Sequence, residues 1–436
     1  MWTICRLPKT ARLTAKRCSH AISRRRNAHA KHARPRDAKR GENKGMDEKL
    51  ALARQFGTPL YVFDGRVLKK RMETLRAALP ANVELCYAVK ANTFIIDLLA
   101  GDVARFEACS EGEARICLEK DSRPGVLVVS GVNKDAAYME ELIAAETPVS
   151  RYTIESRLQF DMLLGLARKH DKRIPLLLRL TSGNQFGLDK SEVCNIIAEF
   201  ADDPHLDIWG IQYFSGTQKT SVKRLARELR TCRKMIDRLA QDYGFTCREV
   251  EFGPGFPVPY FDDEEFDEPA FFNEFAALLD EFAFEGPISL ELGRSIAASC
   301  GTFFTSVVDV KRNDGQNYAI VDGGMNHLVY YGQSLAMRQP TCALLREEGA
   351  LVGEPEFFNI CGSLCSINDI LAKQFELPGL YVGDVLRFDN TGAYCMTEGI
   401  SLFLSRDLPR VCLIDADGEV RLVRDLEPTW QLNESK

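Results

Sequence analysis

Long apolar runs, metal-binding clusters and ordered cysteine pairs are all missing from this sequence. No apolar stretch in its 436 residues approaches the roughly 18 needed to cross a bilayer, which argues against an integral membrane protein. None of the six histidines stands with cysteines or carboxylates at metal-ligand spacing, so we expect no bound metal. The 14 cysteines include no CxxC pair and lie mostly in apolar contexts, which predicts a reduced, cytoplasmic protein.

Acidic residues are nearly absent from residues 1–45. This segment holds 14 Lys and Arg but only Asp37 and Glu42, which predicts a disordered basic leader. The composition of this segment fits a basic tail or a targeting peptide. It also fits an over-extended start, with the true initiator at Met46. The remaining chain carries 42 basic and 60 acidic residues, a net charge of −18, which argues against nucleic acid as a partner.

Short β-type runs alternate with amphipathic segments from Val83 onward. The strand candidates are 83–90, 105–110, 126–131, 149–154, 174–180, 207–216, 248–255 and 287–293. The helix candidates between them are 111–120, 134–145, 156–170, 190–202, 219–243 and 266–283. Eight units of this kind predict an α/β fold with a closed (β/α)8, TIM-like barrel over residues 81–295.

The pattern changes after residue 295, where strand-like runs are separated by Gly, Asn and Asp turns. This predicts a mostly antiparallel β domain over residues 296–436. The strand-like segment PLYVFD (59–64) precedes the barrel. We therefore expect residues 46–80 to form an N-terminal segment whose strand joins the β domain.

Lys90, in the run CYAVKANTF, directly follows residues that read as a buried strand. One interpretation is that the strand ends at Val89 and that Lys90 turns out to solvent. The other is a lysine held in a pocket, kept partly neutral and ready to form a Schiff base. Reactive groups in such barrels lie at the C-terminal ends of the strands, which favours the second interpretation.

Other unusual residues are expected at the same end of the barrel. Gly216 and Thr217 end the sixth strand, and the turn EFGPGFP ends the seventh, where its backbone amides could face a phosphate. Glu291 and Arg294 follow on the eighth; a mutual surface ion pair is the alternative for these two. A lysine, an anion-binding turn, an arginine and a carboxylate together suggest a phosphorylated aldehyde cofactor.

Five motifs then resemble a known family. They are YAVKAN, EFGPGFP, ELGRSIAASCG, CGSLCSINDIL and DNTGAY. In this order and spacing they resemble the pyridoxal-phosphate-dependent decarboxylases of the alanine-racemase-like group (fold type III), which includes diaminopimelate and ornithine decarboxylases. The resemblance covers about residues 55–425.

The resemblance implies roles for individual residues. Lys90 would carry pyridoxal 5'-phosphate as a Schiff base, Glu291 would pair with its pyridine nitrogen, and Cys365 would donate a proton from the second subunit of a homodimer. The implied cofactor-binding set is Lys90, Phe214, Gly216, Thr217, Gly253, Gly255, Glu291, Arg294 and Tyr394. The implied substrate-binding set is Arg294, Ser366, Asp369 and Tyr394. The expected reaction is decarboxylation of an amino acid through an external aldimine.

Some residues depart from the family pattern. Phe214 stands where many relatives carry a histidine against the cofactor ring, and Pro254 removes one backbone N–H from the phosphate turn. Ser366 stands where diaminopimelate decarboxylases have a glutamate. Those enzymes also carry an arginine a few residues after the segment aligned with DGGMNHL, and this chain has none there. These departures favour another amino acid, or a conjugate from a siderophore or antibiotic pathway. A racemase of the same fold and a non-catalytic cofactor-binding protein are the alternatives.

Overall fold

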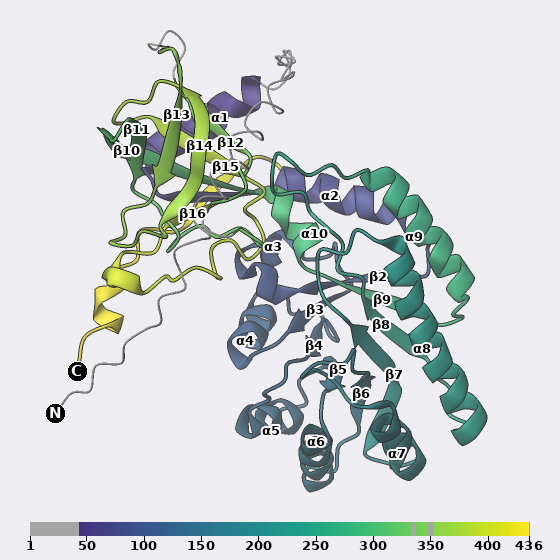
Figure 1. Cartoon of the computed structure of the whole chain (residues 1–436). Coiled ribbons are helices and arrows are strands. Elements are labelled where there is room, and N and C mark those ends of the chain that lie inside the picture. Colours follow the sequence, from purple (N-terminus) through teal and green to yellow (C-terminus); the bar gives the residue numbers. More distant parts are fainter. Residues whose placement is uncertain (1–42, 334–335, 347–351, 436) are drawn as a thin grey trace, which may run out of the picture. The chain divides into compact units, whose positions relative to one another are not determined.

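The computed structural model describes residues 43–333, 336–346 and 352–435 (Figure 1). The chain divides into one unit that ends at Glu48 and a second that runs from Lys49 to the C-terminus. Residues 1–42 of the predicted basic leader lie outside the described residues, and helix α1 covers Asn43–Phe56. The barrel and the β sheet belong to the second unit, so the expected boundaries at residues 80 and 295 stay predictions.

Eight parallel strands close into a barrel in chain order, from β2 to β9. They are β2 (Val83–Ala88), β3 (Arg105–Ala108), β4 (Leu127–Val129), β5 (Val149–Ile154), β6 (Ile174–Arg179), β7 (Leu206–Phe214), β8 (Glu249–Gly253) and β9 (Ile288–Leu292). The helices that alternate with them are α3 (Ile96–Leu99), α4 (Glu111–Lys120), α5 (Ala136–Ala144), α6 (Arg157–Lys169), α7 (Lys190–Phe200), α8 (Val222–Tyr243), α9 (Glu268–Phe282) and α10 (Arg294–Ala297). Figure 1 shows α4 to α9 outside the strands, and the predicted TIM-like barrel is confirmed.

Local sequence signals define where the barrel helices begin and end. Ser110, Asp135 and Ser156 precede α4, α5 and α6, and each side chain accepts the backbone N–H of the residue three positions on. Helix α8 ends at Gly244, whose left-handed conformation (φ +64°) suits a residue without a Cβ. The three N-caps lie on the side of the barrel mouth, because each of these helices follows the C-terminal end of a strand, whereas Gly244 leads back to the opposite end, where β8 begins.

The second part of this unit is a mixed, mostly antiparallel nine-stranded sheet. Its strands are β1 (Leu60–Asp64), β10 (Gly301–Asn313), β11 (Gln316–Val321), β12 (Cys342–Leu345), β13 (Pro355–Cys361), β14 (Ile370–Pro378), β15 (Val385–Asp389), β16 (Arg410–Ile414) and β17 (Val420–Arg424). Strand β1 pairs antiparallel with β10 and parallel with β16. Helix α2 (Gly65–Ala78) then leads from β1 to the barrel.

The first barrel strand is two residues shorter than the sequence predicts. It ends at Ala88, and Lys90 lies in the short 3-10 turn η1 (Val89–Ala91). Asn92 fixes this turn, because its backbone N–H donates to the carbonyl of Val89 and its side chain accepts the N–H of Phe94. The prediction that the strand continues to Lys90 was wrong, because buried apolar residues of a turn and of a strand look alike in sequence.

Charged residues fill the inside of the barrel below its mouth. The carboxylate of Glu249 on β8 lies between the guanidinium groups of Arg105 and Arg151. Glu251, two residues further along β8, is fully buried, and no described residue forms a hydrogen bond with either of its carboxylate oxygens. Burial, together with the nearby charges of Glu291 and Glu107, raises the pKa of Glu251 well above its ordinary value.

We expect Glu251→Gln to change how stability depends on pH. The folded-state pKa of Glu251 lies above that of the unfolded chain, so between the two values only the folded state holds the proton. Stability from this group is therefore present at low pH and is lost as the pH rises through that range. The Gln variant should melt at a higher temperature than the wild type at pH 8, with the difference vanishing towards pH 4.

The measurement is thermal unfolding of both proteins across this pH range. Glu119→Gln, at an exposed position on α4, is the matched control and should leave the pH dependence unchanged. A Glu251→Gln curve that runs parallel to the wild type would show that this carboxyl group does not hold a proton in the fold.

Candidate active site

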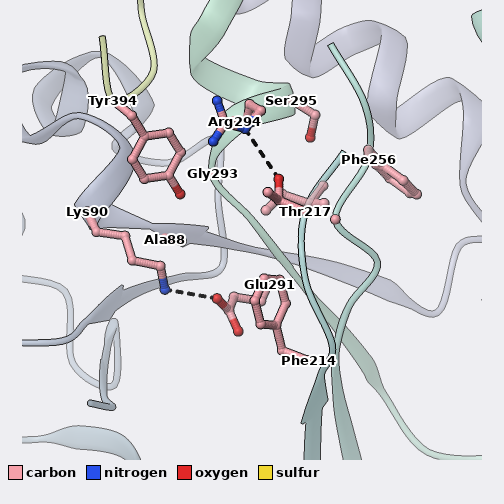
Figure 2. A pocket seen from close by; sticks show the side chains of 12 residues that line it. Ala88, Lys90, Phe214, Thr217, Phe256, Glu291, Gly293, Arg294, Ser295 and Tyr394 are labelled. Atoms are coloured by element: carbon pink, nitrogen blue, oxygen red, sulfur yellow. Dashed lines mark hydrogen bonds and ion pairs between the residues drawn. The ribbon is translucent and has the colours of Figure 1, made fainter. Parts of the chain in front are cut away.

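A pocket of about 360 Å³, open to solvent, lies at the C-terminal ends of β2, β7, β8 and β9 (Figure 2). Its lining residues are Ala88, Lys90, Phe214, Thr217, Gly255, Phe256, Glu291, Leu292, Gly293, Arg294, Ser295 and Tyr394. Segments far apart in the sequence therefore meet where a barrel places its reactive groups.

Lys90 is held by two carboxylates. Its Nζ lies 2.7 Å from Glu107 Oε2 and 3.1 Å from Glu291 Oε1, and 35% of its side chain remains exposed. Cys109 Sγ lies 3.6 Å from the same nitrogen. Burial alone would lower the pKa of Lys90, but the charges of Glu107 and Glu291 outweigh it and hold the pKa well above its ordinary value. The lysine is thus charged in this arrangement and does not turn freely into solvent.

The two carboxylates differ in their environment. Burial would raise the pKa of Glu107, but the ammonium group of Lys90 outweighs this and lowers it. For Glu291, burial and then the charge of Glu107 raise the pKa. Its second oxygen accepts a hydrogen bond of 2.9 Å from the Gln212 side chain. Glu291 is therefore the more readily protonated of the two acids that contact Lys90.

Glycines shape the next part of the pocket wall. Gly216 and Gly255 both have positive φ values, of +130° and +61°. A Cβ on Gly255 would lie only 2.1 Å from the carbonyl oxygen of Gly216, so these two loops approach each other too closely for any side chain there. A Cβ on Gly253 would meet the Phe214 ring at 2.3 Å. The loops after β7 and β8 thus meet backbone to backbone at the pocket edge, where Thr217 and Gly255 line the pocket, and we call this arrangement the glycine cup.

Arg294 supplies the positive charge of this cup. Its Nη1 donates to the Tyr260 hydroxyl (2.8 Å) and its Nε to Thr217 Oγ1 (3.3 Å), while its guanidinium lies 4.6 Å from the centre of the Tyr394 ring. It makes no ion pair with Glu291 in the described part of the chain, so the surface-pair alternative is wrong. The neighbouring Ser295 hydroxyl is buried and forms no hydrogen bond within the part of the chain that the structure describes.

Tyr394 reaches this pocket from the segment that follows β15. Its backbone N–H donates to the carbonyl of Ala91 (2.8 Å), and its φ of +65° reflects a tight turn. Burial raises the pKa of its hydroxyl to about 12, so the group is a neutral hydrogen-bond donor at physiological pH. Figure 2 shows Tyr394 and Lys90 on the same side of the pocket, across from Phe214.

The predicted Cys365 lies elsewhere. It is exposed, in the loop between β13 and β14, and does not line the pocket. Asp369, in the same loop, is buried and accepts the backbone N–H groups of Met325 and Leu364. Its contacts hold the loop in place, and the roles expected for Cys365, Ser366 and Asp369 stay predictions.

Several residues of the site were missed by the sequence analysis. They are Glu107, Gln212, Tyr260 and Ser295. Glu107 offered a signal, because it is a lone carboxylate within the predicted strand RFEACS, at the level of Lys90. The other three are ordinary polar residues whose importance depends on contacts between distant segments.

Comparison with known proteins gives the family of the chain. Residues 66–298 match the model of the family described as pyridoxal-dependent decarboxylase, pyridoxal binding domain. The diaminopimelate decarboxylase of Vibrio cholerae is 29% identical over 87% of this chain and 94% of its own. The L-glutamyl-[BtrI acyl-carrier protein] decarboxylase of Niallia circulans is 24% identical over 88% and 94%.

A solved structure, that of AQ1208 from Aquifex aeolicus, has a TM-score of 0.77 at 26% identity and covers 88% of this chain and 92% of its own. The family model spans more than half of the chain and includes the whole barrel from β2 to β9. The family expected from the five motifs is confirmed. This chain belongs to the pyridoxal-dependent decarboxylases.

Proposed function

We propose that this chain is a pyridoxal-phosphate-dependent carboxy-lyase that removes the α-carboxylate of an amino acid as carbon dioxide. The observation that carries this proposal is Lys90, held between Glu107 and Glu291 beside a cup that suits an anion. Membership of the decarboxylase family supports the same chemistry.

The residues present fit the cofactor. The backbone of Gly255 forms part of the pocket wall at a point where no Cβ could be accommodated, and the buried Ser295 hydroxyl has no hydrogen-bond partner among the described residues. Together with Thr217 and Arg294 these groups would hold the phosphate. Glu291 would hold a proton at the pyridine nitrogen, and Lys90 would attach to the aldehyde carbon. Bound pyridoxal phosphate supplies the electron-withdrawing group that takes up the electron pair left when carbon dioxide departs.

The protein's own groups prepare Lys90 for this attachment. An ammonium group is not a nucleophile, so Lys90 must first lose a proton. Glu291 Oε1 lies 3.1 Å away and belongs to the acid whose pKa is raised, so it is the better acceptor of that proton. Glu107 then remains charged and keeps the nitrogen oriented through its 2.7 Å contact. The hydroxyl of Tyr394 is neutral and can donate to an anionic group without adding charge.

The substrate proposal is an amino acid other than free diaminopimelate. Ser366 is a short, uncharged residue in the position after Cys365, so it offers no carboxylate for a distal ammonium group. Tyr394 lines the pocket and can donate to a substrate carboxylate, and Arg294 would serve either the phosphate or that carboxylate. The name of the Niallia relative, which acts on a glutamyl group carried by a protein, supports a conjugated amino acid as the second candidate.

The test is an assay of the full-length protein loaded with pyridoxal phosphate. Free L-, D- and meso-amino acids and glutamyl-loaded carrier protein are offered, and carbon dioxide and product mass are measured. Release from one of them supports the decarboxylase and identifies its substrate. Exchange of the α-proton without carbon dioxide would instead indicate a racemase, and cofactor binding without either reaction a non-catalytic protein.

We expect Lys90→Ala to abolish the absorption band of lysine-attached cofactor and to lower carbon dioxide release by roughly a thousandfold. Absorption spectroscopy and the release assay check this. Lys223→Ala is the matched control, because Lys223 is exposed on α8 and no carboxylate contacts it in the described residues. A Lys90→Ala protein that keeps the band would place the attachment on another lysine.

We also propose a homodimer in which Cys365 acts in the site of the partner subunit. Cys365 is exposed and absent from the lining of its own chain's pocket. Exposed apolar side chains accompany it, with Ile367 91% and Phe357 54% accessible. Such surfaces favour burial against another subunit.

Mixing two inactive variants tests this arrangement. Lys90→Ala and Cys365→Ala chains, unfolded and refolded together in equal amounts, should recover about a quarter of wild-type activity, because half of the dimers would contain one intact site of two. Each variant refolded alone is the control. A mixture no more active than the two separate variants would show that Cys365 does not act across a subunit interface.

No helix in the described residues is long and apolar enough to span a membrane. The cysteines described in the structure are all free thiols, which supports the proposed location in the reducing cytoplasm.

A further inference from the structure

Lys219 is a buried lysine beside the pocket, and the chemistry described above does not use it. It lies in the loop between β7 and α8, and its side chain has no exposed surface. Its Nζ lies 2.7 Å from Glu228 Oε2 on α8. An ammonium group is costly to bury even when it is paired, so a purely structural role would be served as well by an apolar side chain.

The contacts of Lys219 join the two loops that form the glycine cup. Its backbone N–H donates to the carbonyl of Gly255 (2.9 Å). Its Nζ donates to the carbonyl of Gly253 (3.3 Å) and to Ser215 Oγ (3.1 Å). One residue thus spans the turn after β8 and the loop after β7. Each of these loops contributes a residue to the pocket lining.

The cluster around Lys219 also carries a net positive charge. Glu228 pairs with both Lys219 and Arg224, so two cations share one carboxylate. The Nζ of Lys219 lies 5.8 Å from the centre of the Phe214 ring and 5.9 Å from that of Phe252. These aromatic faces stabilise a cation that has lost its water. Among the described residues, Arg294 is the only cation in the pocket lining besides Lys90, and Pro254 offers no N–H in the turn.

We propose that Lys219 is a positioning residue for the phosphate group of the cofactor: it fixes the glycine cup from behind and adds positive charge where the turn lacks an N–H. This inference rests on the proposed function. It concerns the phosphate alone, so Lys219 contributes to the binding of pyridoxal phosphate and not to that of pyridoxal, which lacks the phosphate.

The test compares these two ligands. Full-length protein freed of cofactor is titrated with pyridoxal phosphate and with pyridoxal, and the dissociation constants are read from the absorption of lysine-attached ligand. The dissociation constant of pyridoxal divided by that of pyridoxal phosphate measures the contribution of the phosphate. Free pyridoxal closes to a ring form, which weakens its binding by the same factor in every variant. This effect therefore cancels when the ratios of two variants are compared. We expect Lys219→Met to reduce this ratio about tenfold, with pyridoxal affinity nearly unchanged.

A second variant guards against a failure to fold. Lys219→Met leaves Glu228 charged and buried, whereas Lys219→Met/Glu228→Gln removes both charges, a change that buried ion pairs often tolerate. The double variant should show the same reduction of the ratio, about tenfold. Lys223→Met, at an exposed position a few residues along the chain, is the matched control and should keep the wild-type ratio.

The outcomes separate the two proposals. Equal weakening of both ligands, or an unchanged ratio in both Lys219 variants, would overturn the role of Lys219. A wild-type protein that attaches neither ligand would instead contradict the proposed function, because the comparison requires that Lys90 react with the aldehyde.

Discussion

The ammonium group of Lys90 lies between the carboxylates of Glu107 and Glu291, and this charge cluster sets the requirements for the rest of the site. Two buried acids so close together would be costly without a cation between them. Only a closed barrel brings them together here, because Glu107 on β3 and Glu291 on β9 lie on either side of β2, which leads into the Lys90 turn. The fold and the chemistry therefore depend on the same strand pairings.

The cup beside this cluster follows a different principle. Its shape comes from missing side chains, since Gly216 and Gly255 approach more closely than any Cβ allows. Its charge comes from side chains held from outside the turn, with Arg294 fixed by Tyr260 and Thr217 and, in our proposal, Lys219 placed behind the loops. Backbone alone could bind an anion, but a turn with a proline in it has fewer donors to offer. Neighbouring cations compensate for that loss.

Periodic features of the sequence predicted much of this molecule. The alternation of apolar strands and amphipathic helices predicted the barrel, and the ends of those strands predicted that Lys90, Glu291 and Arg294 would meet. The 3-10 turn at Lys90 could not be predicted, because it depends on the hydrogen bonds of Asn92, one of which reaches the carbonyl of Gly392. Ser295 and Lys219 escaped notice for a similar reason, since burial and missing partners are properties of the fold. The role of Cys365 stays a prediction, because it depends on a second subunit.

The most direct test of the account is to reduce the protein with borohydride in the presence of pyridoxal phosphate and to map the labelled peptide by mass spectrometry. Reduction makes the link between lysine and cofactor permanent. The account predicts one label per chain, on Lys90. A label on Lys219 or on any other lysine, or no label at all, would contradict the central claim that the cation between Glu107 and Glu291 is the group that carries the cofactor.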